Sequence, residues 1–262
     1  DDLLVPSAVE HLLGVARDSN ADQVFFSAQS FYDSYEALEQ HPGFTTYYNY
    51  TGEYEKQLSG KELFVQLREN GDFKPSACLQ LIKRDFLTEH SLTFMTGIIH
   101  EDNLFTVQCL SVSTSSFVLP EQLYLRRVRC ESIMTSKKGL RNAFGYYRSI
   151  IGVARFLDAE PSSTERDFAE ALQTQVSIWR RDAAKYTALA STEDLDAFLE
   201  TLSVGDRVLF KTIIVDQVKS DRAFAKEKKK QSAEISRVKK SHSYRIGHML
   251  LAPPRWLKAK LK

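Results

Sequence analysis

The sequence predicts an α/β front region followed by an all-helical back region. Up to about residue 136, short runs of β-forming residues alternate with stretches of helical periodicity, which is the pattern of a sheet covered by helices. From Lys138 onward, apolar residues recur only at helical spacing and over long segments. We therefore expect two regions, residues 1–136 and 137–262.

Each element of the front region follows from a local pattern. Residues 6–16 open on a proline and carry apolar side chains on one face, which predicts a helix capped by Ser7. The β-forming residues 22–28 predict a strand. The tyrosine-rich segment 31–60 is polar and irregular, and we interpret it as a loop. Further patterns predict helices at 60–69 and 102–110, buried apolar segments at 76–87 and 94–99, and short strands at 116–119 and 123–128.

In the back region, helical periodicity predicts long helices separated by short breaks. One break is marked by Pro161 and the two serines after it, and Thr192 begins a typical helix-start signature. The expected helices span residues 138–157, 164–190, 193–202 and 205–240.

Composition excludes several classes of protein. A chain of 262 residues with 43% hydrophobic and 26% charged residues is typical of a soluble globular protein, and no run of eighteen apolar residues predicts a transmembrane helix. Cys78, Cys109 and Cys130 are widely spaced and form no CxxC pair. We interpret them as free thiols in a reducing compartment, neither a disulfide framework nor a zinc site.

The near-neutral net charge hides a strong asymmetry. Residues 217–262 contain 14 Lys and Arg against 3 Asp and Glu, whereas the rest of the chain has 21 against 31. A basic tail on an acidic body indicates an anionic partner, such as a membrane surface, a nucleic acid or the body itself. The mixture of Trp, Leu and Lys in residues 243–262 suits an anchor on anionic lipid. We do not expect nucleic-acid binding, because the sequence has no known motif for it.

Two acidic pairs are candidates for chemistry. Glu101 and Asp102 follow an apolar run and His100, and they open a predicted helix, so a carboxylate is expected at the mouth of a buried element, where it can act as a general base. Asp1 and Asp2 open the chain without an initiating Met, and we expect that a preceding part has been lost.

Three blocks of sequence resemble bacterial family-2 glycosyltransferases of the GT-A fold. Residues 1–6, DDLLVP, are similar to the end of the metal-binding D-S-D-D-x-x-x-P signature of that family. Residues 81–87, LIKRDFL, together with 97–103, GIIHEDN, resemble its K-R-x-x-L and G-x-x-x-E-D block. Residues 123–135 contain LYLRRVR and SIMT, similar to its L-Y-x-x-R and S-I-M-T block. The resemblance covers roughly residues 1–150 and implies the C-terminal part of a GT-A, Rossmann-like catalytic domain followed by the helical region.

The resemblance also implies a reaction and roles for residues. Asp1 and Asp2 would hold a divalent metal, Mg or Mn, that bridges the diphosphate of a nucleotide-sugar donor. Asp102, with Glu101 beside it, would remove the proton from an acceptor hydroxyl, and the sugar would be transferred with inversion. Arg127 or Arg129 would contact the diphosphate. By the same resemblance His100 would touch metal or acceptor, and the acceptor would be a saccharide or a lipid-linked molecule.

The chain departs from the family at its front. The nucleotide-binding half that opens the family domain, and the first acid of the metal signature, have no counterpart in this sequence. We therefore expect about ninety residues of the family domain to be missing, an estimate based on the size of a βαβαβ unit. The chain alone could then be inert.

Each signal also has a structural interpretation that stays open. Acids at a chain terminus or a helix start are favourable without any metal or catalysis, a histidine is often purely structural, and the arginines of 126–129 could be a solvated edge strand. Tyr47, Tyr48, Tyr50 and Tyr54 could line a sugar site or form a partly buried cluster. The basic segment 226–240 could be a solvated or coiled-coil helix.

Taken together, the sequence predicts a metal-dependent, inverting glycosyltransferase of bacterial surface-polysaccharide synthesis. It would work in the cytoplasm, or at the inner face of the cell membrane. The alternative is a non-catalytic remnant that acts as a helical interaction module or a membrane-surface module.

Overall fold

The computed structural model describes residues 1–54, 57–159 and 165–240. The chain divides into two compact units, Asp1–Ile214 and Val215–Lys262. The division therefore falls after Ile214 and not near residue 136. The physical reason is that the first long helices of the back region, α6 (Leu140–Ala159) and α7 (Arg166–Thr187), pack on α5 (Glu101–Val112) and α3 (Gly60–Glu69) of the front region.

A four-stranded sheet lies in the first unit, with the strand order β1 (Leu3–Leu4), β4 (Ser116–Val128), β2 (Gln23–Tyr32) and β3 (Gln80–Ile82). Strands β2 and β4 are parallel, and the two outer strands pair antiparallel to their neighbours. The two segments predicted as separate strands, 116–119 and 123–128, form the single strand β4. Its register against β2 shifts around Pro120, which has no backbone N–H to donate to the ladder.

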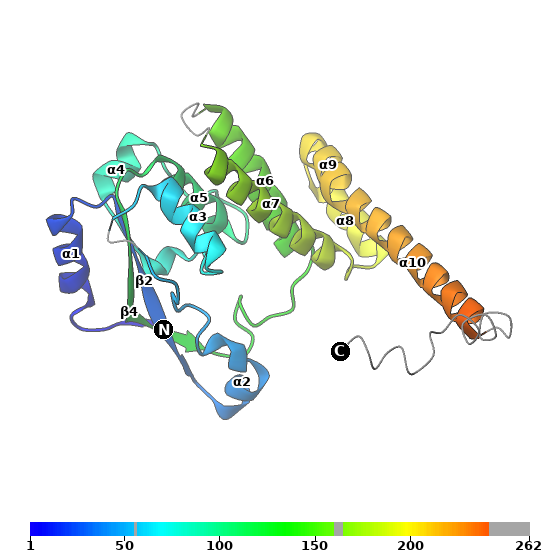
Figure 1. Ribbon diagram of the computed structural model, residues 1–262, viewed down its shortest axis with the longest axis horizontal. Coiled ribbons are helices and arrows are strands. Elements are labelled where there is room, and N and C mark those ends of the chain that lie inside the picture. The colour runs from blue at the N-terminus through cyan, green and yellow to red at the C-terminus, as the bar shows by residue number, and fades with distance from the viewer. Residues whose placement is uncertain (55–56, 160–164, 241–262) are drawn as a thin grey trace, which may run out of the picture. The chain divides into compact units, whose positions relative to one another are not determined.

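Helices cover both faces of the sheet (Figure 1). Val24 and Phe26 of β2 pack with Leu12 of α1 (Ala8–Asp18), while Phe25 packs with residues of α3 and α5. Successive side chains of a strand point to opposite faces, so β2 contributes to two cores at once. This explains its nearly continuous apolar sequence, which is typical of a strand buried on both sides.

Short helices occupy the segments between strands. Part of the region interpreted as a loop, 31–60, is helical, because α2 (Tyr35–Gln40) and a 3₁₀ turn (Pro42–Phe44) follow β2. Ser34 caps α2 by accepting a hydrogen bond from the backbone N–H of Ala37, which the sequence reading overlooked. A second 3₁₀ turn (Ala77–Leu79) and α4 (Arg84–Glu89) flank β3.

The helical region follows the prediction closely. Helices α6, α7 and α8 (Thr192–Thr201) lie where periodicity placed them. The predicted helix 205–240 is present as an unbroken helical run, in which a π-helical segment, Lys211–Val215, lies between α9 (Val204–Phe210) and α10 (Asp216–Lys240). Asp206 of α9 binds α6, accepting from Tyr147 at 3.0 Å and pairing with Arg148 at 3.3 Å.

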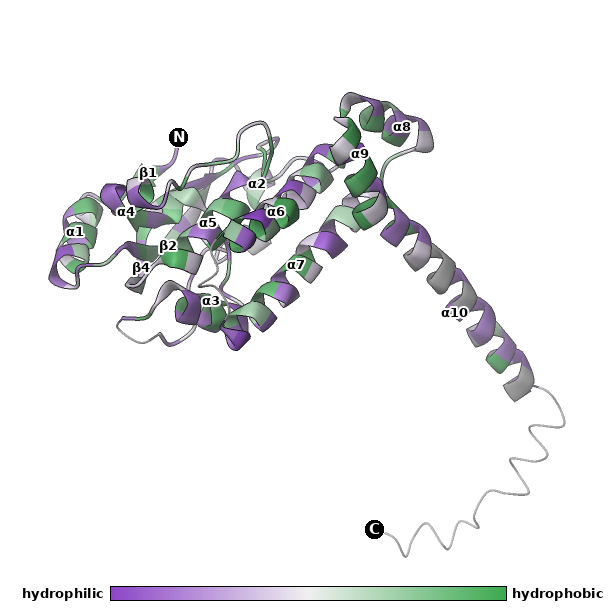
Figure 2. Cartoon of the chain, turned by 90° about the horizontal axis from the view of Figure 1, so that it is seen from above, coloured by the Kyte–Doolittle hydropathy of each residue, from purple (hydrophilic) through white to green (hydrophobic). Residues whose placement is uncertain are grey.

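The second unit contains α10, which is coloured as largely hydrophilic in Figure 2. The lysines of its middle part, among them Lys228, Lys229 and Lys230, are exposed. No helix within the described residues is both long enough and apolar enough to cross a membrane. The segment predicted as a lipid anchor, 243–262, lies outside the described residues, as does the predicted break at Pro161.

Candidate functional site

The acidic pair predicted to be catalytic lies at the start of α5. Glu101 and Asp102 form the first turn of the helix, directly after His100. In the turn that precedes this acidic pair, Gly97 and His100 have left-handed backbone conformations, with φ of 79° and 71°. A histidine with positive φ is uncommon, and such strained positions are found preferentially at functional sites. The sharp turn presents both carboxylates at the end of an otherwise buried helix.

Asp102 has an unusual protonation equilibrium. Burial of the carboxyl group, reinforced by the negative charge of the neighbouring Glu101, raises the pKa of Asp102 to about 7. Backbone hydrogen bonds of Asp102 and Asn103 oppose this shift but are outweighed. An ordinary acid at a helix N-terminus would be stabilised in its charged form. Asp102 shows the opposite, and a carboxylate that titrates near neutral pH is suited to general-base chemistry.

His100 is fixed in place by its neighbours. Its ring stacks on Tyr146 of α6, with centroids 4.4 Å apart and an interplanar angle of 18°, and Nε2 lies 3.3 Å from the amide nitrogen of Asn142. Burial and the charge of Lys138 lower the pKa of His100 to about 4, so the ring is neutral at physiological pH. These contacts hold the His100 ring against α6. Its contact with metal or acceptor stays a prediction.

The close approach of α6 to this turn depends on Gly145. A Cβ atom at that position would collide with the backbone carbonyl oxygen of Ile99. The glycine lets the helix backbone lie directly against the turn that carries His100 and Asp102. Gly145 was not singled out in the sequence, because nothing local shows that a helix backbone must pass so near.

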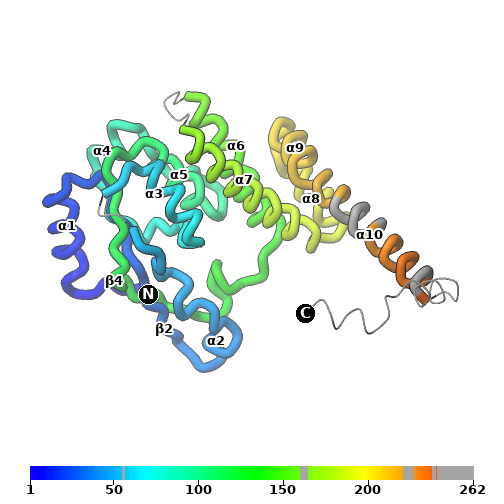
Figure 3. The backbone as a smooth tube through the Cα atoms, in the orientation of Figure 1, coloured from blue at the N-terminus to red at the C-terminus, as the bar shows by residue number. Residues whose placement is uncertain are grey.

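The other predicted site residues meet at the edge of the sheet where β1 pairs with β4. Asp2 accepts hydrogen bonds from the Tyr124 hydroxyl and from the backbone N–H of Arg127, both at 2.7 Å. Asp1 pairs with Arg129 across 3.3 Å. The structure thus brings the predicted metal-binding acids and the predicted diphosphate-binding arginines together, although they are more than 120 residues apart in the chain. Figure 3 shows how the chain continues from this strand end through residues 129–139 to α6.

Arg126 precedes Arg127 in β4 but, unlike Arg127 and Arg129, it is buried. Arg126 is 9% exposed, and its guanidinium lies over the rings of Phe44 and Tyr48, with Cζ 4.6 and 4.9 Å from the ring centroids. Its Nη1 is buried and has no hydrogen-bond partner within the described part of the chain. Arg127 and Arg129 are exposed, as the solvated interpretation of these arginines expected, but Arg126 is buried, and β4 lies between β1 and β2 and is not an edge strand.

The tyrosine-rich segment is divided between core and surface. Tyr50 and Tyr54 pack against the main core, and the Tyr54 hydroxyl donates to the buried carboxylate of Asp72 at 2.6 Å. Tyr47 is 40% exposed. Of the four tyrosines, Tyr47 therefore has the most accessible ring, and the buried-cluster interpretation describes Tyr50 and Tyr54.

Electrostatics link the two parts of the site through this segment. Burial raises the pKa of Tyr47 and Tyr48, Arg126 lowers it, and Asp102 raises it. Both tyrosines therefore lie within electrostatic range of the predicted base and of the buried arginine. Three further residues nearby were missed in the sequence. Burial raises the pKa of Tyr146 on α6, and Tyr186, Asp182, Tyr47 and Asp102 raise it further, while burial, Asp182 and Tyr47 raise the pKa of Tyr186 on α7. Their only sequence signal is the i,i+4 spacing of Asp182 and Tyr186 on one helix face.

Metal binding is supported by residue type alone. Across residues 1–54, 57–159 and 165–240, no group of three or more His, Cys, Asp and Glu side chains is arranged to hold a metal ion. Asp1 and Asp2 offer carboxylate oxygens, the donors that Mg²⁺ and Mn²⁺ prefer, and Mg²⁺ commonly uses only one or two carboxylates together with substrate phosphates. Both carboxylate oxygens of Asp2 already accept hydrogen bonds and Asp1 is paired with Arg129, so metal binding by this pair stays a prediction.

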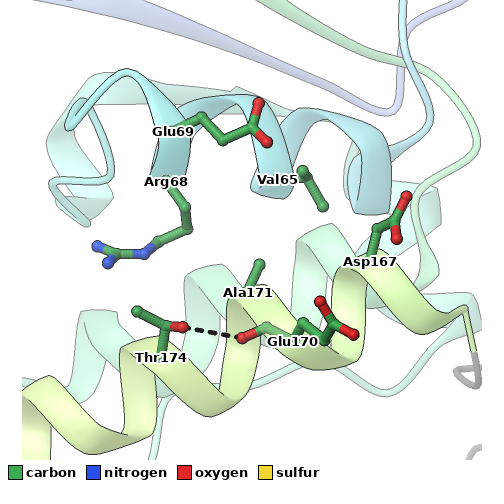
Figure 4. A pocket seen from close by; sticks show the side chains of 7 residues that line it. All are labelled: Val65, Arg68, Glu69, Asp167, Glu170, Ala171 and Thr174. Carbon is green, nitrogen blue, oxygen red and sulfur yellow. Dashed lines mark hydrogen bonds between the residues drawn. The ribbon is translucent and has the colours of Figure 1, made fainter.

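One pocket of about 320 Å³ lies away from this site, between α3 and α7 (Figure 4). Arg68 enters it from α3, and Asp167 and Glu170 line it from α7. Burial lowers the pKa of Arg68, and its Nε lacks a partner within the described residues. None of the residues predicted for catalysis lines this pocket.

Comparison with known proteins identifies the fold. No protein-family profile matches the chain, and no curated protein matches its sequence. Among solved structures, the chain is similar to residues 1–349 of TarS from S. aureus in complex with UDP-GlcNAc, with a TM-score of 0.50 and 14% identity over 84% of this chain. The same TarS fragment in complex with UDP gives 0.48 at 14% identity, also over 84% of this chain and 56% of that one.

The chain spans 57% of the length of the TarS fragment bound to UDP-GlcNAc. At this identity the similarity establishes the fold. The protein has a mixed α/β, glycosyltransferase-like fold with a helical C-terminal region, as the sequence predicted.

Proposed function

We propose that this chain carries the acceptor-side half of an inverting, metal-dependent glycosyltransferase of family 2, in the synthesis of a bacterial surface polysaccharide. The observation that carries the proposal is the raised pKa of Asp102, which is about 7. Asp102 lies at the start of α5, near partly exposed tyrosines. The glycosyltransferase-like fold supports it. TarS binds UDP-GlcNAc, which makes a nucleotide-sugar the donor class to test first.

The reaction assigns a separate task to each part of the site. Asp102 accepts the proton of an acceptor hydroxyl while that oxygen attacks the anomeric carbon of the donor. The bond from the anomeric carbon to the diphosphate breaks on the opposite face, so the configuration inverts. Burial, reinforced by the charge of Glu101, keeps the pKa of Asp102 high enough for it to take the proton near neutral pH.

The donor diphosphate belongs at the sheet edge formed by β1 and β4. Asp1 and Asp2 would hold the divalent metal, which supplies positive charge to the departing nucleotide diphosphate. Arg127 and Arg129 would contact phosphate oxygens. Their present ion pairs are exposed and individually weak, so a diphosphate with its metal can replace them at low cost.

Removal of divalent metal is expected to abolish transfer. The protein expressed from its natural gene would be incubated with radiolabelled UDP-GlcNAc and other nucleotide-sugars plus a cell-wall saccharide fraction, with Mg²⁺ or Mn²⁺ and then with excess EDTA. Incorporation should fall at least about 100-fold with EDTA and return on adding metal, because the leaving diphosphate needs a cation. Incorporation unaffected by EDTA would contradict the metal assignment. No incorporation from any donor would favour the non-catalytic interaction module.

A second role at a membrane surface is favoured by the exposed lysines of α10. In this proposal the protein works at the inner face of the cell membrane, and residues 243–262 add the main contact with anionic lipid. Deleting 243–262 should remove most binding to vesicles containing 30% phosphatidylglycerol in a sedimentation assay, and 0.5 M salt should have a similar effect because it screens charge. Undiminished binding of the shortened protein would refute the anchor.

A further inference from the structure

Three aromatic rings from different elements form a stack beside the proposed base. The His100 ring lies on Tyr146, and Tyr146 in turn stacks on Tyr186 of α7, with centroids 6.2 Å apart and an interplanar angle of 25°. All three residues are partly exposed. The stack therefore borders the surface, unlike a ring cluster in a hydrophobic core.

Two carboxylate side chains, those of Asp102 and Asp182, lie near this stack. Asp102 stands next to its His100 end, and Asp182 is on the same face of α7 as Tyr186, one helical turn earlier. The side chain of Asp182 is 30% exposed, and its ion pair with the exposed Arg181 is long, at 3.9 Å. Such a pair contributes little and leaves carboxylate oxygens free for other donors.

Tyr47 lies within electrostatic range of both tyrosines of the stack, Tyr146 and Tyr186, and lines a neighbouring pocket. Asp102 and Asp182 each raise the pKa of Tyr47 and of Tyr146, so these two rings lie within range of both carboxylates. Tyr47 also lines a pocket of about 310 Å³ together with His41, Pro42 and Phe44. That volume is at the lower end of ligand pockets, enough for a small molecule or one unit of a chain.

This combination suits a polyhydroxylated ligand. The C–H bonds of a pyranose ring pack on the electron-rich face of an aromatic ring, and its hydroxyls donate charge-assisted hydrogen bonds to carboxylates. Two carboxylates of the same sign also repel an anionic group placed between them. A hydrophobic protein partner is a poorer fit, because it would bury both carboxylates without compensating donors.

We propose that Tyr47, Tyr146 and Tyr186 form the binding surface for the uncharged sugar unit of the acceptor, and that Asp182 is a specificity-determining residue that accepts hydrogen bonds from its hydroxyls. The proposal rests on the proposed function, since Asp102 then takes the proton from the sugar held on these rings. Asp182 would select the acceptor, and Asp102 would activate it.

Saturation-transfer NMR on the full chain tests this surface without requiring turnover. The probes are the methyl β-glycosides of glucose, galactose and N-acetylglucosamine, with methyl β-glucuronide as the anionic counterpart of the glucoside. We expect saturation of the ring protons of at least one neutral glycoside and a weaker signal from the glucuronide. Tyr186→Ala should weaken binding about fivefold, the order expected for one aromatic contact. Asp182→Ala should weaken it at least about tenfold, the order expected for one charge-assisted hydrogen bond.

Conservative variants keep the test independent of folding. Tyr186→Phe retains the stacked ring and should retain binding, and Asp182→Asn keeps the shape of the side chain but should weaken binding. Tyr35→Ala removes a tyrosine that is 73% exposed on α2 and should change nothing. Equal binding by the Tyr186→Ala, Asp182→Ala and unchanged chains would overturn the proposal, as would the absence of saturation for every neutral glycoside.

The two proposals fail in different ways. If no donor sugar is ever transferred but the glycosides bind and the variants weaken them, the proposed function fails and the binding surface stands. If transfer occurs while Asp182 and Tyr186 variants leave glycoside binding unchanged, the surface assignment fails and the function stands.

Discussion

Replacing Asp102 with asparagine is expected to lower the rate of sugar transfer by about two to four orders of magnitude, the range that general-base catalysis contributes. Asparagine keeps the size of the side chain but cannot take up the acceptor proton. The measurement is the initial rate of transfer by the protein expressed from its natural gene, compared with the unchanged protein at the same donor concentration. A rate within about threefold of the unchanged protein would refute the assignment of Asp102 as base.

The pH dependence of the same reaction provides an independent check. Burial and Glu101 raise the pKa of Asp102 to about 7, so the carboxylate form needed for catalysis increases as pH rises through about 7. The transfer rate should therefore rise between pH 6 and 8 and level off above. Glu101→Gln removes the neighbouring negative charge, so the pKa of Asp102 should fall and the rise should move to lower pH. An unshifted profile in Glu101→Gln would contradict the contribution of the Glu101 charge to the raised pKa of Asp102.

The stability of the Asp102→Asn variant shows whether a loss of activity is a catalytic effect or a folding defect. A carboxyl group with a raised folded-state pKa holds its proton more tightly in the folded state than in the unfolded state. Its ionisation therefore destabilises the protein as pH rises from about 4 to about 7, following the linkage between protonation and folding. Asp102→Asn removes this penalty, so its melting temperature at pH 8 should equal or exceed that of the unchanged protein. A lower melting temperature would indicate damage to the fold.

Replacing Gly145 with alanine is expected to destabilise the protein, although it adds only one methyl group. The new Cβ would collide with the Ile99 carbonyl, and both sides of this contact are backbone, so neither can move without shifting α6 or the turn before α5. Overpacking of this kind costs about 1–3 kcal/mol. For a chain of this size, this corresponds to a fall in melting temperature of about 2–12 °C. Because the displaced turn carries His100 and Asp102, transfer should also fall.

Gly14→Ala is the matched control for this substitution. Gly14 lies within helix α1, and a Cβ there would meet no atom within 4 Å. Alanine is favoured over glycine inside a helix by up to about 1 kcal/mol, so this variant should melt at the same or a slightly higher temperature. If Gly145→Ala and Gly14→Ala changed stability alike, the close packing of α6 against the Ile99 turn would not be as described.

Local patterns were sufficient for most helices and for the chemical identity of the acids. Helix α3 begins at Gly60 because Ser59 and Glu62 form a capping box, a signal contained in four consecutive residues. The acidic pair at 101–102 was recognisable because it follows a buried apolar run. Periodicity also located α6, α7 and α8, whose apolar faces recur every three to four residues. In each case the deciding interactions span only a few residues.

What the sequence alone determined is therefore the set of elements, the asymmetry of charge and the residues that could act as base or bind phosphate. Only the tertiary structure decided which residues meet. Strand β1 pairs antiparallel with β4, which brings Arg127 beside Asp2, and the packing of α6 and α7 places Tyr146 within electrostatic range of both Asp102 and Asp182. These contacts join segments dozens of residues apart, and local sequence carries no signal for them, because they depend on how buried surfaces of whole helices and strands pack together.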